Sequence, residues 1–310
     1  MEKQLKKSEI LFLYETSYNI PNGDPFTGEQ RYDEETKKIL VSDVRMKRFI
    51  RSYFEEKGFP VYVSEKTGAG KTDAKGVLKW IFEHRKDKNN TDIAELLKEQ
   101  IDVRLFGGIS TLKDNDTQSM KCTNGHIQFT GPVQFALLNP SLNEVDLRLH
   151  QNTTHFTSRA ENTQGSIGTT TLVPYSIIQI HGWVNLKIAE KTGMTEEDLK
   201  LMYEGLWYGT SGDGSSHSRS KVGQNSVLLV EIEYSQNNQK IYGADRLIKI
   251  DSREGKKGEQ LRSMDDYRID FTRLFEAANS EKVHRIKFYT EIETIKFELL
   301  GKPKFELIKL

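Results

Sequence analysis

The stretch ILFLYETSYNIPNGDPFTGEQRYD, residues 10–33, joins an apolar run to a turn of unusual composition. The run from Ile10 to Thr16 is typical of a buried β-strand. Pro21 and Pro25 then bracket one Asn, one Gly and one Asp. Proline fixes φ, glycine admits positive φ, and Asn and Asp bond their own backbone. We therefore predict a strand that ends in a turn of fixed shape.

An amphipathic helix is predicted soon after this turn, over DVRMKRFIRSYFEEKG at residues 43–58. Its apolar residues follow the spacing i, i+3, i+4, i+7, i+8 and are Met46, Phe49, Ile50, Tyr53 and Phe54. Ser42 and Asp43 are candidate N-caps. Gly58 and Pro60 end the helix.

The rest of the chain alternates between predicted strands and helices. Helices are expected near Gly76–Arg85, near Thr91–Gln100 and from Thr195 to Gly209, and strands over His126–Leu138 (broken at Gly131-Pro132), Leu172–Leu186 and Ser226–Tyr234. The polar tract Gln151–Thr171 predicts a projecting hairpin or loop. From about residue 236 we expect a strand, a helix near Asp265–Ala278, and strands around Ile286–Tyr289 and Ile295–Leu299.

The order of the core elements is strand, helix, strand, strand, helix, strand, with long insertions. This order predicts an α+β protein with a ferredoxin-like βαββαβ sandwich, in which two helices lie on one face of a sheet. A doubly wound parallel sheet is the competing topology.

Composition limits the classes of function. The 310 residues carry 45 Lys and Arg against 45 Asp and Glu, which counts against a free-standing nucleic-acid binder but allows a local basic stripe. The single cysteine, Cys122, rules out an internal disulfide and a multi-thiolate zinc site. Because no apolar stretch could span a bilayer and no signal peptide is recognisable, we expect a cytoplasmic protein without a membrane partner.

No sequence motif indicates catalysis or a cofactor. The stretch TGAGKTDAKG suggests a phosphate-binding loop, but Glu65 stands where that motif needs glycine, so we reject a nucleotide hydrolase. The seven histidines lack the spacing of metal ligands. We therefore predict no catalytic residue, no metal and no cofactor.

Four basic side chains lie within seven positions of the first helix: Arg45, Lys47, Arg48 and Arg51. No acidic residue lies between Asp43 and Glu55, so we expect no nearby carboxylate to relieve the repulsion inside this cluster. The helix start at Ser42 also leaves backbone N–H groups available to an anion. A solvated helix flank is the alternative, and we favour an anion-binding face.

Two further stretches could contact a ligand. The loop SSHSRSK, residues 215–221, offers hydroxyls, Arg219 and Lys221 among flexible glycines, although a solvated linker has the same composition. Arg159 is the one basic residue of the Thr/Asn/Gln-rich tract, which suits contact with a polar polymer or a plain surface hairpin.

Taken together, these stretches resemble the backbone subunit of CRISPR-associated type I Cascade complexes, the repeated RNA-binding subunit of the RAMP superfamily. The type I-B group is the most similar. The resemblance extends in order to about Tyr234 and is carried by NIPNGDP, VSDVRMKRFIR, RLFGG (Arg104–Gly108), GPVQF (Gly131–Phe135), VPYSIIQIHGW and GLWYGTSGDGSSHSRSKVGQ.

The resemblance implies a hand-like protein. Its RRM-like palm would span residues 1–235, with a finger insertion at about 60–125, a thumb insertion at about 139–171, and a C-terminal extension, residues 236–310, that packs on the palm. With the basic helix, the RNA-contacting residues are then expected to be Asn22, Ser42, Arg45, Lys47, Arg48, Arg51, Arg159, Arg219 and Lys221.

The implied function is a scaffold, not an enzyme. Copies of the protein would stack along the guide RNA (crRNA) and present it to a target DNA strand, and the balanced charge is consistent with such side-by-side packing. Further implied partners are the large subunit, the subunit that caps the crRNA 5′ end and, indirectly, a recruited helicase-nuclease. The alternative is a RAMP-type endoribonuclease that processes the crRNA precursor, with His155 or His217 as general base.

Overall fold

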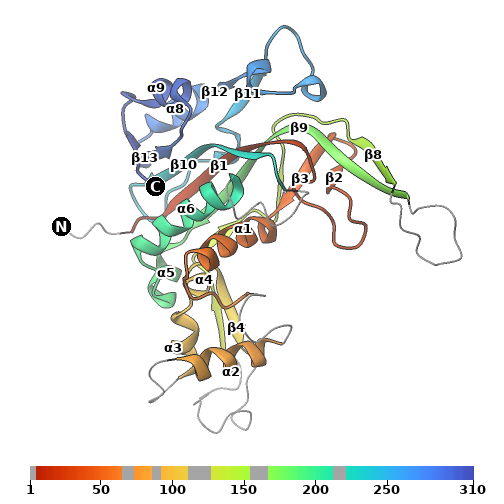
Figure 1. Ribbon diagram of the computed structural model, residues 1–310. Coiled ribbons are helices and arrows are strands. Elements are labelled where there is room, and N and C mark those ends of the chain that lie inside the picture. Colours follow the sequence, from red (N-terminus) through yellow and green to blue (C-terminus); the bar gives the residue numbers. More distant parts are fainter. Residues whose placement is uncertain (1–4, 65–72, 86–91, 111–126, 154–166, 212–220) are drawn as a thin grey trace, which may run out of the picture.

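The central β-sheet is organised around β1 (Ser8–Asn19), the strand predicted near the start of the chain (Figure 1). The computed structural model describes residues 5–64, 73–85, 92–110, 127–153, 167–211 and 221–310. β1 pairs antiparallel with β10 (Gln224–Tyr234) on one side and with β9 (Ile167–Val184) on the other. β6 (Val133–Phe135) pairs antiparallel with β9, which gives the order β10-β1-β9-β6. The chain is a mixed α+β protein, as predicted.

Two helices, α1 (Asp43–Glu56) and α6 (Glu196–Ser211), cover one face of this sheet (Figure 1). Their apolar stripes pack against Phe12 and other inward side chains of β1 in one buried cluster. The two helices approach closely because α6 carries glycine at the contact. A Cβ atom on Gly209 would lie 2.6 Å from the backbone oxygen of Phe49. The short helix α5 (Leu186–Thr192), which the sequence analysis did not predict, precedes α6.

The C-terminal segment, residues 236–310, packs on the opposite face of the sheet. Its elements are η2 (Ala244–Arg246), β11 (Lys249–Ser252), η3 (Gly258–Gln260), η4 (Met264–Asp266), β12 (Tyr267–Asp270), α8 (Thr272–Ala278), β13 (Val283–Tyr289), α9 (Glu293–Leu299) and β14 (Phe305–Leu307). β13 pairs with β10 and β14 pairs with β13, so this segment also widens the central sheet. Leu11 and Leu13 of β1 belong to the second buried cluster, which lies under this segment.

A small helical unit projects from the α1 side of the molecule (Figure 1). It comprises α2 (Ala74–His84), α3 (Ile93–Lys98), α4 (Ile101–Phe106), β4 (Gly107–Ser110) and β5 (Ile127–Thr130). A third buried cluster, which includes Leu78 and Leu97, forms its own core. β5 pairs with β4, so this unit continues to Thr130.

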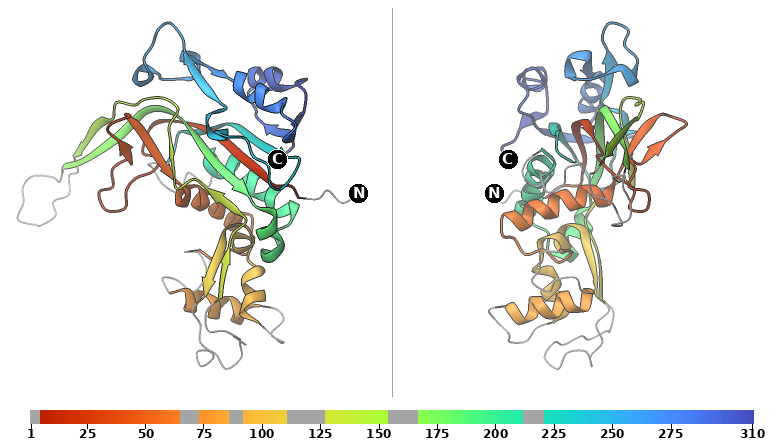
Figure 2. Two further views of the ribbon diagram at one scale, coloured as in Figure 1. Left: turned by 180° about the vertical axis from the view of Figure 1, so that it is seen from behind. Right: turned by 45° about the vertical axis from the view of Figure 1, so that its right-hand side comes forward.

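A long hairpin extends from the other end of the sheet (Figure 2). β8 (Arg148–Thr153) pairs with the first part of β9, which places the two ends of the polar tract on neighbouring strands. Of the hairpin or loop predicted for residues 151–171, the hairpin is thus confirmed for the described part of the tract. Beside the hairpin lies a small sheet of β2 (Tyr32–Asp33), β3 (Lys38–Ser42) and β7 (Leu138–Pro140).

Two predictions for the C-terminal segment are wrong. The expected strand at Ile295–Leu299 is the helix α9, because its two buried residues lie four positions apart, on one face of a helix. The expected helix at Asp265–Ala278 is α-helical only from Thr272. Its first two residues belong to the 3-10 helix η4, and the next four form β12, where buried Tyr267 and Ile269 alternate with more exposed neighbours.

Candidate nucleic-acid interface

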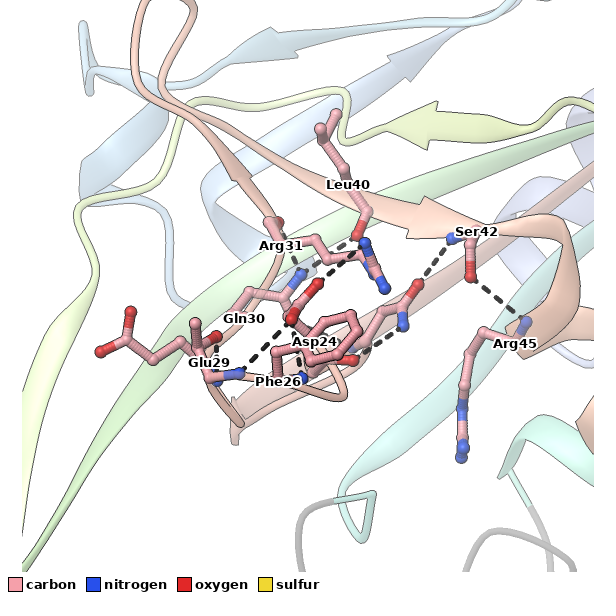
Figure 3. Close-up of polar contacts among 11 residues, drawn as sticks. Asp24, Phe26, Glu29, Gln30, Arg31, Leu40, Ser42 and Arg45 are labelled. Carbon is pink, nitrogen blue, oxygen red and sulfur yellow. Dashed lines mark hydrogen bonds and ion pairs between the residues drawn. The ribbon is translucent and has the colours of Figure 1, made fainter.

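The turn after β1 is fixed by Asp24, as the sequence indicated (Figure 3). The Asp24 carboxylate accepts the backbone N–H of Phe26 at 2.9 Å and pairs with Arg31 at 3.1 Å. Backbone bonds join Asp24 to Glu29 and Gly28 at 2.7 and 2.8 Å. The N–H of Phe26, with help from Thr27 and Arg31, holds the pKa of Asp24 below its usual value. The Asp24 carboxylate therefore stabilises the turn.

Asn22 connects the turn to the start of α1. Its side-chain oxygen accepts the backbone N–H of Ser42 at 2.6 Å, and its backbone N–H donates to the side-chain oxygen of Gln30 at 2.8 Å. The residue is buried, with 7% of its surface exposed. In this structure Asn22 therefore positions the helix, and RNA contact at this residue stays a prediction.

Ser42 is the N-cap of α1, as predicted. Its backbone is extended, and its hydroxyl oxygen accepts the N–H of Arg45 at 3.4 Å. Because Asn22 holds the backbone of Ser42, the turn determines where the helix begins and where its first basic residues lie.

The expectation that no nearby carboxylate relieves the charge repulsion in the basic cluster is wrong for two residues of the cluster. Lys47 pairs with Asp43, one helical turn earlier, at 3.0 Å. Arg51 pairs with Asp102 of α4 at 2.9 Å. Asp102 is fully buried and also accepts the backbone N–H groups of Tyr62 and Val63 at 2.7 and 3.1 Å. Arg51 therefore ties α1 to the helical unit.

Arg45 differs from these two residues. The residue is half-buried, and its guanidinium carbon lies 4.0 Å from the ring centre of Phe49. Its Nε is buried without a hydrogen-bond partner among the described residues. No carboxylate among the described residues pairs with it. Burial lowers the pKa of Arg45 to about 10, and the charge of Arg48 contributes. Arg45 is thus a charge without a counter-charge in the described chain.

Lys221 approaches the same place from the start of the segment before β10. It is 7% exposed, and its ammonium donates to the backbone oxygen of Ile20, directly before the turn. Burial lowers the pKa of Lys221 to about 8, and the positive charge of Arg45 adds to this effect. The structure thus brings together Arg45, Arg48 and Lys221 at the start of α1, and we call these three residues the cation cluster.

Other predicted residues lie outside the described residues: Arg159 and Arg219, together with His155 and His217 of the nuclease alternative. Sequence reasoning missed Tyr14 and Asp102. The hydroxyl of Tyr14 is fully buried without a hydrogen-bond partner in the described chain, and burial raises the pKa of Tyr14, an effect that the positive charge of Arg45 partly offsets. Tyr14 lies in the apolar run of the predicted strand, and Asp102 stands between Ile101 and Val103, so no local pattern marks either residue as part of the site.

The residues that the structure describes contain no group of three or more His, Cys, Asp or Glu side chains arranged to hold a metal ion. Nor does any helix among them have the length and apolar character needed to cross a membrane.

Comparison with known proteins identifies the family. The family model described as CRISPR-associated protein Cas7 matches residues 6–272. The chain belongs to the Cas7 family. A CRISPR-associated protein Cas7 of Haloferax volcanii is 31% identical over 286 residues, which cover 88% of this chain and 82% of the relative. The resemblance stated from the sequence is confirmed at the level of the family, and the type I-B group stays a prediction.

Two solved structures share the fold of this Cas7 protein. One, a CRISPR RNA-guided surveillance complex in a pre-nicking state, has a TM-score of 0.55 and 13% identity, and the match covers 98% of this chain and 97% of that chain. The other, a CRISPR RNA-guided surveillance complex, has a TM-score of 0.51 and 11% identity, with 97% and 94% covered. At such low identity the likeness concerns the fold alone.

Proposed function

We propose that this Cas7 protein is the crRNA-binding backbone subunit of a type I CRISPR interference complex. The observation that carries the proposal is the cation cluster, in which Arg45 and Lys221 converge at the start of α1 and Arg45 has no carboxylate partner in the described chain. Lys and Arg contacts to phosphate hold a nucleic acid without reading its sequence. Such contacts suit a subunit that must accept any guide and leave recognition to base pairing.

The arrangement of elements supports an RRM-like, ferredoxin-like palm in residues 1–235. Four antiparallel strands in the order β10-β1-β9-β6, with α1 and α6 on one face, follow the chain order expected for βαββαβ. We assign the helical unit to the finger, about 60–125 with its last strand reaching Thr130, and the β8–β9 hairpin to the thumb, about 139–171.

In this proposal the protein works as a polymer in the cytoplasm. Copies lie side by side along the crRNA and present it to the target DNA strand. The large subunit and the crRNA 5′-end-capping subunit join the same complex, and a helicase-nuclease is recruited indirectly. The membership in the Cas7 family and the shared fold with subunits of RNA-guided surveillance complexes support this set of partners.

We propose a scaffold without nuclease activity. Incubation of the purified protein with labelled repeat RNA tests this point directly. Intact RNA is the expected result. Site-specific cleavage that is lost in His155→Ala or His217→Ala would instead assign the endoribonuclease function.

The experiment that tests RNA binding is reversal of one charge. Arg45→Glu should weaken binding of single-stranded RNA about tenfold or more, because a charge-assisted hydrogen bond contributes about 1.5–3 kcal/mol. The measurements are RNA affinity and the nucleic-acid content of the purified protein. Arg45→Gln, which is neutral and long, is the second variant, since Arg45 also packs on Phe49.

Arg273→Glu is the matched control. Arg273 is exposed on α8 in the C-terminal segment, so the same change of charge is made away from the cation cluster. Unchanged RNA affinity in both Arg45 variants, with normal melting temperatures, would contradict the proposal.

A further inference from the structure

A pocket of about 450 Å³ lies on the face of the central sheet that is turned away from α1. One side of the pocket is formed by β9 and β7, and the other by η2 and β11 of the C-terminal segment. Gln179 of β9 points to this face because Ile177, two positions earlier, belongs to the buried cluster under the C-terminal segment. The sheet therefore separates this pocket from the cation cluster. Its volume is within the range of about 300–1,000 Å³ that small-molecule sites have.

Gln179 forms the polar floor of the pocket. The residue is 6% exposed, and its Nε2 donates to the backbone oxygen of Asp245 at 2.5 Å, which joins the sheet to the C-terminal segment. This bond fixes the orientation of the amide, because a reversed amide would turn its oxygen toward another oxygen. The Oε1 of Gln179 is buried and has no hydrogen-bond partner among the described residues. A buried acceptor of this kind calls for a donor from a ligand or a water.

A second polar side chain of β9, His181, lines the pocket and is held in place from two sides. Its Nε2 lies 2.7 Å from the carboxylate of Glu9, and its ring centre lies 4.1 Å from that of Trp183. Glu9 also accepts the hydroxyl of Tyr234 at 2.7 Å. The floor of the pocket is thus fixed before any ligand binds, which lowers the entropic cost of binding.

Three cationic side chains line the pocket from both of its sides: Lys38 from β3, Arg246 from η2 and Lys249 from β11. Lys38 donates to the backbone oxygen of Leu142 at 3.4 Å, and no carboxylate among the described residues forms an ion pair with either lysine. Asp245 is the one carboxylate among the described lining residues, and it lies 3.9 Å from the Nε of Arg246. Three cations against one carboxylate favour an anionic ligand. A phosphate monoester, with a charge of about −1.5 to −2, matches this excess better than a single carboxylate does.

We propose that this pocket binds a mononucleotide. The phosphate lies at the mouth, where Arg246 and Lys249 are exposed, and the nucleoside extends to the buried floor, where a base N–H or a ribose hydroxyl donates to the Oε1 of Gln179. Leu138 and Ile248 supply apolar walls for the base. Because the two sides of the pocket belong to different parts of the chain, the nucleotide holds the C-terminal segment to the sheet. The inference is independent of the proposed RNA site, which lies on the other face.

Titration calorimetry of the full chain with AMP tests the proposal. We expect saturable binding and a melting temperature that rises with AMP concentration, because a ligand that binds only the folded state stabilises it. Lys249→Glu should weaken AMP binding about tenfold or more, since it removes a charge-assisted hydrogen bond to the phosphate and adds a repulsion. Lys282→Glu is the matched control. Lys282 is exposed in the same C-terminal segment, directly before β13 and away from the pocket, so this variant should bind AMP like the wild type.

Three smaller ligands separate the two ends of the site. Adenosine lacks the phosphate, ribose 5-phosphate lacks the base, and inorganic phosphate lacks the whole nucleoside. Each should bind more weakly than AMP, because each leaves either the cations or the floor of the pocket without a partner. Equal binding of AMP and inorganic phosphate, or of AMP and adenosine, overturns the assignment of a mononucleotide.

The remaining outcomes distinguish this inference from the proposed RNA-binding function. Arg45→Glu changes the other face of the sheet, so it should leave AMP binding unchanged even where it weakens RNA binding. Failure to saturate with AMP at millimolar concentration, or equal AMP affinity of Lys249→Glu and the wild type, overturns the nucleotide site alone. Displacement of AMP by an acidic peptide at the same concentration would assign the pocket to a protein partner. Displacement by single-stranded DNA from the Arg45→Glu variant would assign it to a polynucleotide. Either displacement would also overturn the inference.

Discussion

The two halves of α1 carry the same kind of charge and use it differently. At the N-terminal end, Arg45 lies on the ring of Phe49 without a carboxylate partner in the described chain, close enough to Lys221 to lower its pKa. Six residues later, Arg51 pairs with the buried Asp102 and joins α1 to the helical unit. The basic residues of α1 thus serve two purposes, a candidate binding surface at Arg45 and a structural contact at Arg51. The two are distinguished by whether a carboxylate from elsewhere in the chain pairs with the residue.

The largest effect is expected at the structural joint. Asp102→Ala should lower the free energy of unfolding by about 3–5 kcal/mol, because Arg51 loses a buried partner and two backbone N–H groups lose their acceptor. Chemical denaturation followed by circular dichroism measures this change. Asp146→Ala, which removes an exposed partner of Lys37, is the control and should change stability by less than about 1 kcal/mol. Equal effects of the two substitutions would remove the distinction between the halves of α1.

The pair of Arg51 with Asp102 also decides how a double variant of the basic cluster must be interpreted. From the basic cluster alone, Lys47→Glu with Arg51→Glu would be expected to remove RNA binding while the protein stays folded. The structure shows that Arg51→Glu places a second carboxylate beside the buried Asp102, so loss of RNA in that variant would reflect loss of structure. Arg45 is the residue at which binding and folding can be separated.

The features that were predicted correctly rest on short-range patterns. The strand at Ile10, the N-cap at Ser42 and the apolar stripe of α1 are encoded within a few positions, and the structure confirms all three. The partner of Arg51 was not predictable, because Asp102 belongs to another helix and no local pattern marks it. The helix α9 was missed because five residues with apolar ones among them fit a strand and a helix equally well.

At the binding end of α1, RNA affinity should depend on pH through Lys221. The pKa of Lys221 is lowered to about 8, so its charge is present at lower pH and is lost as pH rises through that value. A bound phosphate favours the charged form, and RNA affinity should therefore fall about tenfold between roughly pH 7 and pH 9. Lys221→Arg should abolish this dependence, because Arg remains charged over the range. A pH profile shared by both proteins would contradict the role of Lys221.

The same lowered pKa predicts a trend in stability. Between about pH 8 and the usual lysine value near 10.5, the unfolded chain binds the proton and the folded chain does not, so the Lys221 contribution to stability rises with pH. Burial of the charge costs stability below this range, and the cost is relieved above it. Thermal melts of the RNA-free protein across this range, with Lys221→Gln as reference, should show the gain in the wild type alone.

The smallest effect is expected at Lys47, and it decides whether this residue belongs to the binding half or the structural half of α1. Its pair with Asp43 is of the i,i+4 kind, which contributes about 0.3–0.5 kcal/mol, so Lys47→Ala should hardly change the melting temperature. The informative measurement is the dependence of RNA affinity on salt. If Lys47 releases Asp43 to hold a phosphate, Lys47→Ala reduces the slope by about one unit, as the loss of one phosphate contact does. We expect this reduction, since Lys47 lies one turn beyond Asp43 at the start of α1; an unchanged slope would place Lys47 with Arg51 in the structural half.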